Sequence, residues 1–170
     1  MKAVKIIVTF LVILTVIFFG TGLVIKESSY SVEISINKSL EETFASFNDV
    51  STIKEWIPQY KSIEIVDKKA GVTGSVYNIV VEHNKQEVIV KERIMGYVEN
   101  EKVTLFFDRE GVEEIDDYTF KRDGSKTIIT LNSNYQAKSY ILGCVLPYFK
   151  GTFKEVDVEA LNNFKAFIEK

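Results

Sequence analysis

The fold of this 170-residue chain is indicated most clearly by residues 113–134, which read EEIDDYTFKRDGSKTIITLNSN. Residues 113–121 and 126–134 are rich in the β-branched and aromatic side chains that strands favour. The four residues between them, Arg122-Asp123-Gly124-Ser125, form a polar turn signal. The stretch therefore predicts a β-hairpin.

Strand patterns extend from this hairpin back toward the N-terminus. Val32, Ile34 and Ile36 alternate with polar residues, as in a half-buried strand. Asn84-Lys85 is a further tight-turn signal between two strand-like runs. The predicted strands before the hairpin are residues 31–36, 62–66, 75–82, 87–95 and 103–107. Short polar turns between successive strands predict one antiparallel sheet of about seven strands.

Helical signals occur after the first strand and at the C-terminus. Ser39 and Glu42 form a capping box, and a second short helix at residues 52–57 should end before Pro58. A longer apolar stripe with helical spacing predicts one long C-terminal helix, with Pro147 in its first turn or at a kink. The stripe comprises Val145, Phe149, Phe153, Val156, Ala160, Phe164 and Phe167. The expected class is α+β.

Residues 6–25 form an uncharged apolar run of the length that spans a bilayer as a helix. An uncleaved anchor fits this length best, a cleaved secretory signal is the alternative, and a buried helix fits poorly because no polar face is present. Lys2 and Lys5 precede the run, which favours a cytoplasmic N-terminus with the domain outside. We expect an anchor and tether at 1–29 and a folded domain at 30–170.

Composition excludes several kinds of site. All 24 acidic residues but only 19 of the 21 basic residues lie after residue 25, which argues against nucleic acid as a partner. The single histidine, His83, is interpreted as a turn residue, and the single cysteine, Cys144, is far from it in the sequence. We therefore expect no metal, no cofactor and no histidine-based catalytic triad.

The order of these elements, together with local residues, resembles the START-like, or polyketide cyclase/dehydrase (SRPBCC), superfamily over residues 30–170. The resemblance rests on Ser35-Ile36-Asn37, Asp49, Trp56-Ile57-Pro58, Gly71-x-x-Gly74, Glu92 and Tyr118-x-Phe120 before the Asp123-Gly124 turn. It implies a helix-grip fold, in which a curved sheet and a long helix enclose an apolar cavity. Members bind lipids, sterols, polyketides or hormones, and a minority are enzymes.

One group of candidate site residues lies on the predicted strands. Glu92 shares a strand face with Val88, Val90 and Ile94. It is therefore either a carboxylate with a raised pKa in an apolar site or a residue at the solvent-exposed end of its strand. Tyr118 alternates with Asp116 and Phe120, and all three are expected to point inward. Tyr118 could contact a ligand or simply bond the backbone. Asn132 and Asn134 are weaker inward candidates.

Other candidates are aromatic. Trp56 and Tyr60 are expected at a cavity mouth or in a satellite core, and Tyr148, Phe149 and Phe153 are expected to face the sheet from the long helix. Three functions remain open. The first is membrane-anchored binding of a hydrophobic small molecule or lipid. The second is a cyclase or dehydratase with Glu92 as base and Tyr118 at an oxyanion. The third is a partner-binding domain without a ligand cavity.

Overall fold

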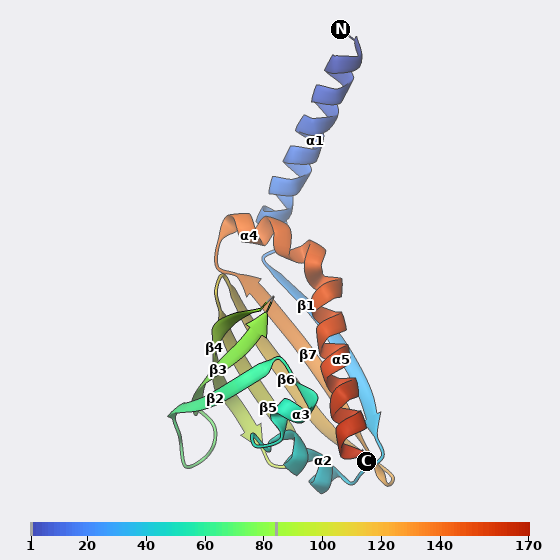
Figure 1. Cartoon of the computed structure of the whole chain (residues 1–170). Coiled ribbons are helices and arrows are strands. Elements are labelled where there is room, and N and C mark those ends of the chain that lie inside the picture. Colours follow the sequence, from blue (N-terminus) through green and yellow to red (C-terminus); the bar gives the residue numbers. More distant parts are fainter. Residues whose placement is uncertain (1, 84) are drawn as a thin grey trace.

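The computed structural model describes residues 2–83 and 85–170, so the predicted turn residue Asn84 lies outside the described residues. Seven strands form one antiparallel sheet in the order β1-β7-β6-β5-β4-β3-β2 (Figure 1). The strands are β1 (Glu27–Ile36), β2 (Tyr60–Asp67), β3 (Val76–His83), β4 (Gln86–Val98), β5 (Lys102–Arg109), β6 (Val112–Asp123) and β7 (Lys126–Ala137). The predicted sheet is confirmed, and β6 and β7 form the predicted hairpin.

Helices precede, interrupt and follow the sheet. They are α1 (Lys2–Val24), α2 (Leu40–Phe47), α3 (Ile53–Trp56), α4 (Tyr140–Val145), the 3₁₀ turn η1 (Leu146–Phe149) and α5 (Lys150–Ile168). The Ser39 side chain accepts a hydrogen bond from the Glu42 amide at 3.3 Å, which caps α2 as predicted. The long helix α5 lies across the β1 side of the sheet (Figure 1), which completes an α+β helix-grip arrangement.

The predicted C-terminal helix is wrong in its first turns. The segment from Val145 to Phe149 belongs to α4 and η1, and α5 begins only at Lys150. Pro147 lies in η1, where its missing amide proton and fixed φ break the α-helical hydrogen-bond ladder. Val156, a member of the predicted stripe, is 56% exposed.

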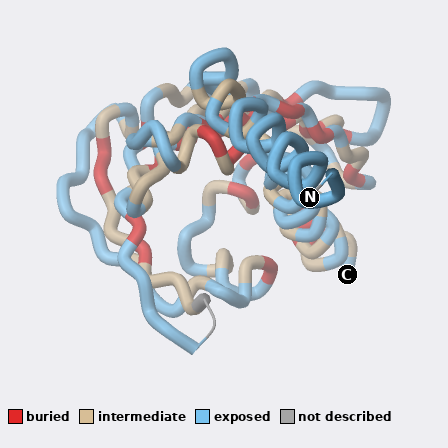
Figure 2. The backbone as a smooth tube through the Cα atoms, turned by 90° about the horizontal axis from the view of Figure 1, so that it is seen from above, coloured by how far each residue is buried: buried red, intermediate tan, exposed pale blue. Residues whose placement is uncertain are grey.

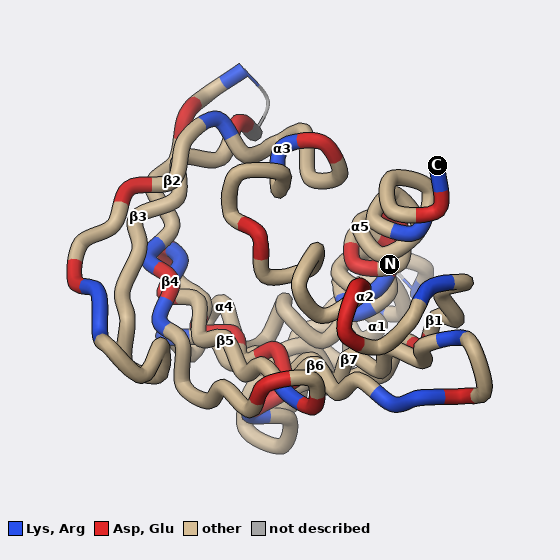
Figure 3. The backbone as a smooth tube through the Cα atoms, turned by 90° about the horizontal axis from the view of Figure 1, so that it is seen from below, with Lys and Arg blue, Asp and Glu red and all other residues tan. Residues whose placement is uncertain are grey.

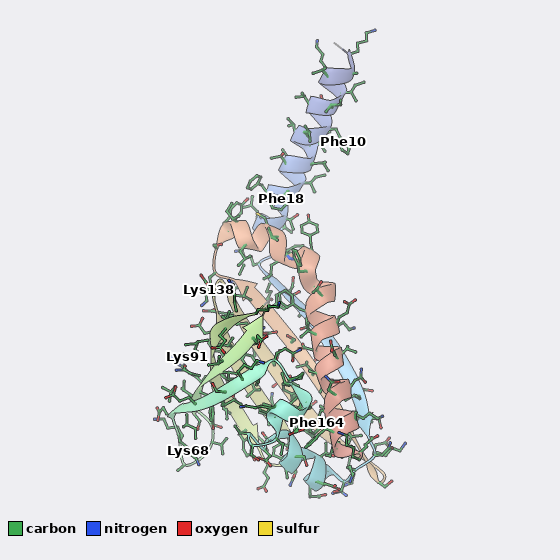
Figure 4. All side chains as sticks on the ribbon, viewed as in Figure 1. Phe10, Phe18, Lys68, Lys91, Lys138 and Phe164 are labelled. Carbon is green, nitrogen blue, oxygen red and sulfur yellow. The ribbon has the colours of Figure 1, made fainter. Side chains whose placement is uncertain are left out.

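The main hydrophobic core lies between α5, α2, α3 and the β1–β7–β6 half of the sheet. Phe164 of α5 is fully buried, and its ring centroid lies 5.4 Å from that of Phe47 and 5.1 Å from that of Trp56 (Figure 4). A smaller cluster of Ile79, Val90 and Phe107 lies on the β3–β4–β5 half.

The apolar helix α1 extends away from the domain (Figure 1) and has no buried residue, so it carries no buried colour in Figure 2. Its C-terminal end contacts α4. The Tyr140 hydroxyl donates to the Phe19 carbonyl at 2.6 Å, and a Cβ on Gly22 would lie 2.5 Å from the Cys144 sulfur. A glycine at position 22 is thus what lets α4 approach α1 so closely.

Candidate functional site

Strand register sets which side chains share the inner face of the sheet. Three rows of paired residues cross β4, β5, β6 and the strands beside them. The first row contains Tyr77, Glu92, Phe107, Glu114 and Tyr135, the second Ile94, Leu105, Asp116, Ser133 and Tyr30, and the third Tyr97, Val103, Tyr118, Leu131 and Val32. Residues between these positions point to the outer face, because side chains alternate along a strand.

A cavity of about 250 Å³ lies over the β3–β6 part of these rows. Helices α2 and α3 and the segment between them supply the opposite wall, at the end of the domain away from α1 (Figure 1). Its lining is mostly aliphatic and aromatic: Phe47, Asn48, Val50, Ile53, Trp56, Ile57, Tyr60, Val72, Tyr77, Glu92, Ile94, Tyr97, Val103, Leu105, Phe107 and Tyr118. Glu92 is the one ionisable carboxyl in this lining.

Four predicted site residues therefore line one cavity: Trp56, Tyr60, Glu92 and Tyr118. Trp56 is 4% exposed, and its indole N–H has no hydrogen-bond partner among residues 2–83 and 85–170. A buried donor without an acceptor costs free energy.

Glu92 lies in an environment that favours its neutral form. Burial raises the pKa of Glu92 from its ordinary value of 4.5 to about 7. Burial, followed by the nearby charge of Glu92, also raises the pKa of Tyr60. A carboxyl with a pKa near 7 in an apolar wall can act as a hydrogen-bond donor or as a general acid or base.

A group of carboxyls adjoins the cavity. Glu114 is paired with Phe107 and Asp116 with Leu105, and both of these partners line the cavity. Asp157 reaches the group from α5, and carboxylate oxygens of the three acids lie within 4.8 Å of one another. Glu114, Asp116 and Asp157 are called the acidic cluster below.

Partners of the acidic cluster come from three strands. Arg109 forms an ion pair with Glu114 (Nη2 to Oε2, 2.8 Å), and the Ser133 hydroxyl lies 3.5 Å from Glu114 Oε1. The Tyr30 hydroxyl donates to Asp157 Oδ2 at 2.6 Å. Asp116 is 4% exposed, and within the described part of the chain its Oδ1 has no partner.

Burial also sets the ionisation of the acidic cluster. Burial raises the pKa of Asp157 to about 6, while the hydrogen bond from Tyr30 opposes the shift. Burial and the neighbouring charges of Glu114 and Asp157 raise the pKa of Asp116 well above its ordinary value. Burial raises the pKa of Tyr118 as well, and the charge of Asp116 adds to the effect. Asp157 therefore changes charge as pH passes through the weakly acidic range.

No family model and no curated protein matches the sequence. Among solved structures, the aromatase/cyclase Zhui from Streptomyces sp. R1128 has a TM-score of 0.70 at 10% identity, covering 84% of this chain and 94% of that one. A START superfamily protein from Mycobacterium smegmatis has a TM-score of 0.68 at 14% identity, covering 83% and 97%. Ara h 8.0201 has a TM-score of 0.68 at 12% identity, covering 84% and 97%.

The chain has the START-like helix-grip fold. The predicted resemblance is thereby confirmed at the level of the fold. At sequence identities of 10–14%, these similarities establish the architecture of the chain but not the chemistry of its site.

The helix-grip interior excludes several of the predicted site residues from the cavity. Asn134 points to the outer face of β7, where its amide lies 3.4 Å from Glu27 Oε2, and Asn132 is exposed, so their predicted inward orientation is wrong. The hairpin register explains this, because Leu131, Ser133 and Tyr135 take the inward positions. Phe120 points inward as predicted, yet it packs against Phe44 and Phe47 in the main core and does not line the cavity.

The aromatic residues predicted on the long helix lie in three settings. Tyr148 and Phe149 are 62% and 50% exposed, so the prediction that they face the sheet is wrong. They fall in η1, whose different helical period turns them away from the sheet. Phe153, in α5, faces the sheet and contacts Tyr135 with ring centroids 4.8 Å apart, outside the cavity lining.

Sequence reasoning missed most of the acidic cluster. Asp116 was expected to point inward, but Glu114, two residues earlier on the same strand face, was not singled out. Alternation along β6 alone would have found Glu114. Asp157 and Tyr30 carry no comparable signal, because their contact joins α5 to β1 across 127 residues of sequence.

Proposed function

We propose that this protein is membrane-anchored and binds a hydrophobic small molecule or lipid in the cavity between the sheet and the helices. The observation that carries this proposal is the cavity of about 250 Å³ with a mainly apolar and aromatic lining. Its volume is just below the range of about 300–1,000 Å³ that is typical of small-molecule sites. Burial of an apolar ligand surface would contribute about 25 cal/mol per Å² before the costs of binding.

Polar groups in the wall would orient the ligand. The Trp56 N–H, the hydroxyls of Tyr60 and Tyr118, and the Glu92 carboxyl all belong to the lining. The unpartnered Trp56 N–H supports a ligand with a hydrogen-bond acceptor on the face that meets α3.

The anchoring part of the proposal is supported at the other end of the domain. We place α1 across the membrane, because its residues 6–24 carry no charge and none of its residues is buried in the protein. The segment 139–149 has no charged residue, and Tyr140, Ile141, Tyr148 and Phe149 are exposed on it. Because α4 contacts Phe19 and Gly22 within the apolar run, α4 and η1 would lie at the membrane interface.

An enzyme of the cyclase type is the second candidate. A carboxyl at position 92 with a pKa of about 7 beside the Tyr60 phenol favours it, since this pair could exchange protons with a bound carbonyl compound. Two of the solved structures with this fold are the aromatase/cyclase Zhui and norcoclaurine synthase from Thalictrum flavum. A pH-dependent reaction rate that Glu92→Gln abolishes would distinguish the enzyme from a binding protein.

The cavity argues against the third function, a partner-binding domain whose interior is closed.

Native mass spectrometry of the full chain purified from membranes tests the binding proposal. Leu105→Trp would fill the cavity from β5, whereas Phe106→Trp places the same side chain on the outer face of the same strand. We expect a discrete adduct on the wild type and on Phe106→Trp, and none on Leu105→Trp.

Two results would contradict the proposal. Wild-type protein at its sequence mass, with no compound enriched over the membrane extract, would argue against an occupied cavity. A mass lacking residues 1–25 would identify α1 as a cleaved secretory signal and would remove the anchor while leaving the cavity to be tested separately.

A further inference from the structure

The charges around the cavity are unbalanced. Four carboxyls, from Glu92 and the acidic cluster, face its inner wall or adjoin it. Among the described residues, the one basic group in contact with them is the Arg109 guanidinium, which is already paired with Glu114. A buried negative charge without a counter-charge is costly, so the site favours a positive group or added protons.

Asp116 marks the place where that positive group would bind. Its Oδ1 is buried and, within residues 2–83 and 85–170, accepts no hydrogen bond. Asp116 is a β6 neighbour of Tyr118 on the same strand face and is paired with Leu105, and both of these residues line the cavity. Asp116 does not itself line the cavity, but it lies beside these two residues on the inner face, so a ligand group that passes between them would meet Asp116.

The geometry points to an organic amine as the ligand class: its apolar body would occupy the cavity and its ammonium group would bind Asp116, Asp157 and Glu114. This inference rests on the proposed binding function and specifies its ligand. Three acceptors of one ammonium, each about 2.8 Å from the nitrogen in tetrahedral directions, lie about 4.6 Å apart. One oxygen from each acid of the cluster lies no more than 4.8 Å from the other two, so the three are close enough together to accept from one ammonium.

An ammonium fits the acidic cluster better than a calcium ion does. Calcium takes six to eight oxygen ligands. Here Arg109 and Ser133 already contact the two oxygens of Glu114, and Tyr30 binds one oxygen of Asp157. Each carboxylate oxygen has about two lone pairs, so one oxygen of each acid can still accept an N–H group of an amine, whereas three such oxygens fall short of the six to eight that calcium takes.

Three probes that differ only in their polar end test the inference: 4-phenylbutylamine, 4-phenylbutanol and 4-phenylbutanoate. The full chain is reconstituted in phosphatidylcholine nanodiscs, and binding is followed by the fluorescence of Trp56, the single tryptophan, which lines the cavity. We expect the amine to bind at least about tenfold more tightly than the alcohol, and the carboxylate more weakly than either.

Matched variants assign the selectivity. Asp116→Asn removes the charge with little change in shape and should bring the amine-to-alcohol affinity ratio down to about 1. Asp117→Asn, on the outer face of the same strand beside Thr104 and Lys102, should keep the wild-type ratio. Asp157→Asn serves as the second variant if far-UV circular dichroism shows that Asp116→Asn does not fold.

The outcomes separate this inference from the proposed function. Equal, saturable binding of amine and alcohol would overturn the amine inference and would leave the cavity function supported. Equal loss of selectivity in Asp117→Asn would also overturn it, because the effect would then come from net charge. Binding of none of the three probes at millimolar concentration would count against both.

Discussion

The two halves of the inner sheet face differ in what covers them. On the β1–β7–β6 half, α5 and α2 bury Phe164, Leu161 and Phe120 in a continuous core. On the β3–β4–β5 half, a cluster of only three buried residues remains, and the cavity lies beside it. Seven strands at about 4.8 Å spacing form a sheet about 29 Å wide, whereas one helix with its side chains is about 10 Å across. A single long helix therefore cannot cover this sheet, and the half that α5 leaves uncovered holds the cavity.

The largest expected effect contrasts one substitution made on each half. Leu161→Ala, in the closed core, should reduce the free energy of unfolding by about 2–5 kcal/mol, because it removes buried contacts and leaves a void. Leu105→Ala, in the cavity wall, should cost about 1–2 kcal/mol, because part of its surface already faces the cavity. Urea unfolding of the full chain in detergent measures both, and equal costs would show that the two halves are packed alike.

The next effect is the pH dependence due to Glu92 on the open half. Its pKa is raised on folding from 4.5 to about 7, so the stability from its neutral form is complete below pH 4.5 and is lost as pH rises to about 7. Glu92→Gln abolishes this loss. Between pH 4.5 and pH 8, the free energy of unfolding of the variant should rise by about 1–3 kcal/mol relative to that of the wild type. This energy range allows for water that reaches the cavity and weakens the effect of burial.

Thermal unfolding at several pH values measures this change. Glu87→Gln, at an exposed position on the same strand, is the matched control and should follow the wild type. The raised pKa of Glu92 would be contradicted by the opposite result. In that case the free energy of unfolding of the wild type would rise between pH 4.5 and pH 7, and Glu92→Gln would lack this rise.

A smaller effect is expected at the β1 edge of the closed half. Tyr30→Phe removes the hydroxyl that donates to Asp157 and so weakens the link between β1 and α5, at a cost of about 1–2 kcal/mol. The same change should raise the pKa of the Asp157 carboxyl further, because the bond from Tyr30 lowers it. Carbon-13 NMR titration of the aspartate carboxyls would detect this shift, and an unchanged Asp157 titration would rule the bond out.

The smallest effect is expected at the surface of the closed half. Arg122 pairs with Glu41 at 2.5 Å, but the two side chains are 54% and 58% exposed. Figure 3 shows such acidic and basic residues interspersed around the domain. Arg122→Ala should change the free energy of unfolding by less than about 0.5 kcal/mol, because water and salt screen exposed pairs. A loss above 1 kcal/mol in urea unfolding would mean that this pair helps to hold α2 against β6.

The sequence predicted those parts of the fold and site that depend on local patterns. Alternation placed Glu92 and Tyr118 on inner strand faces, and the capping box located the start of α2. Patterns were misleading where one residue of register decides the outcome. Asn134 lies one position from an inward residue, and a shift of one exchanges the two faces of a strand. Tyr148 was assigned to a continuous helix that Pro147 interrupts.

By itself, the sequence determined the α+β class, the antiparallel meander, the apolar N-terminal helix and the helix-grip order of elements. Each of these follows from residue periods and turn signals within a few positions of one another. Only the tertiary structure decided which half of the sheet stays open, and that Asp157 of α5 meets Glu114 and Asp116 of β6. Contacts between elements more than 40 residues apart depend on how the helix and sheet pack together, which no local period encodes.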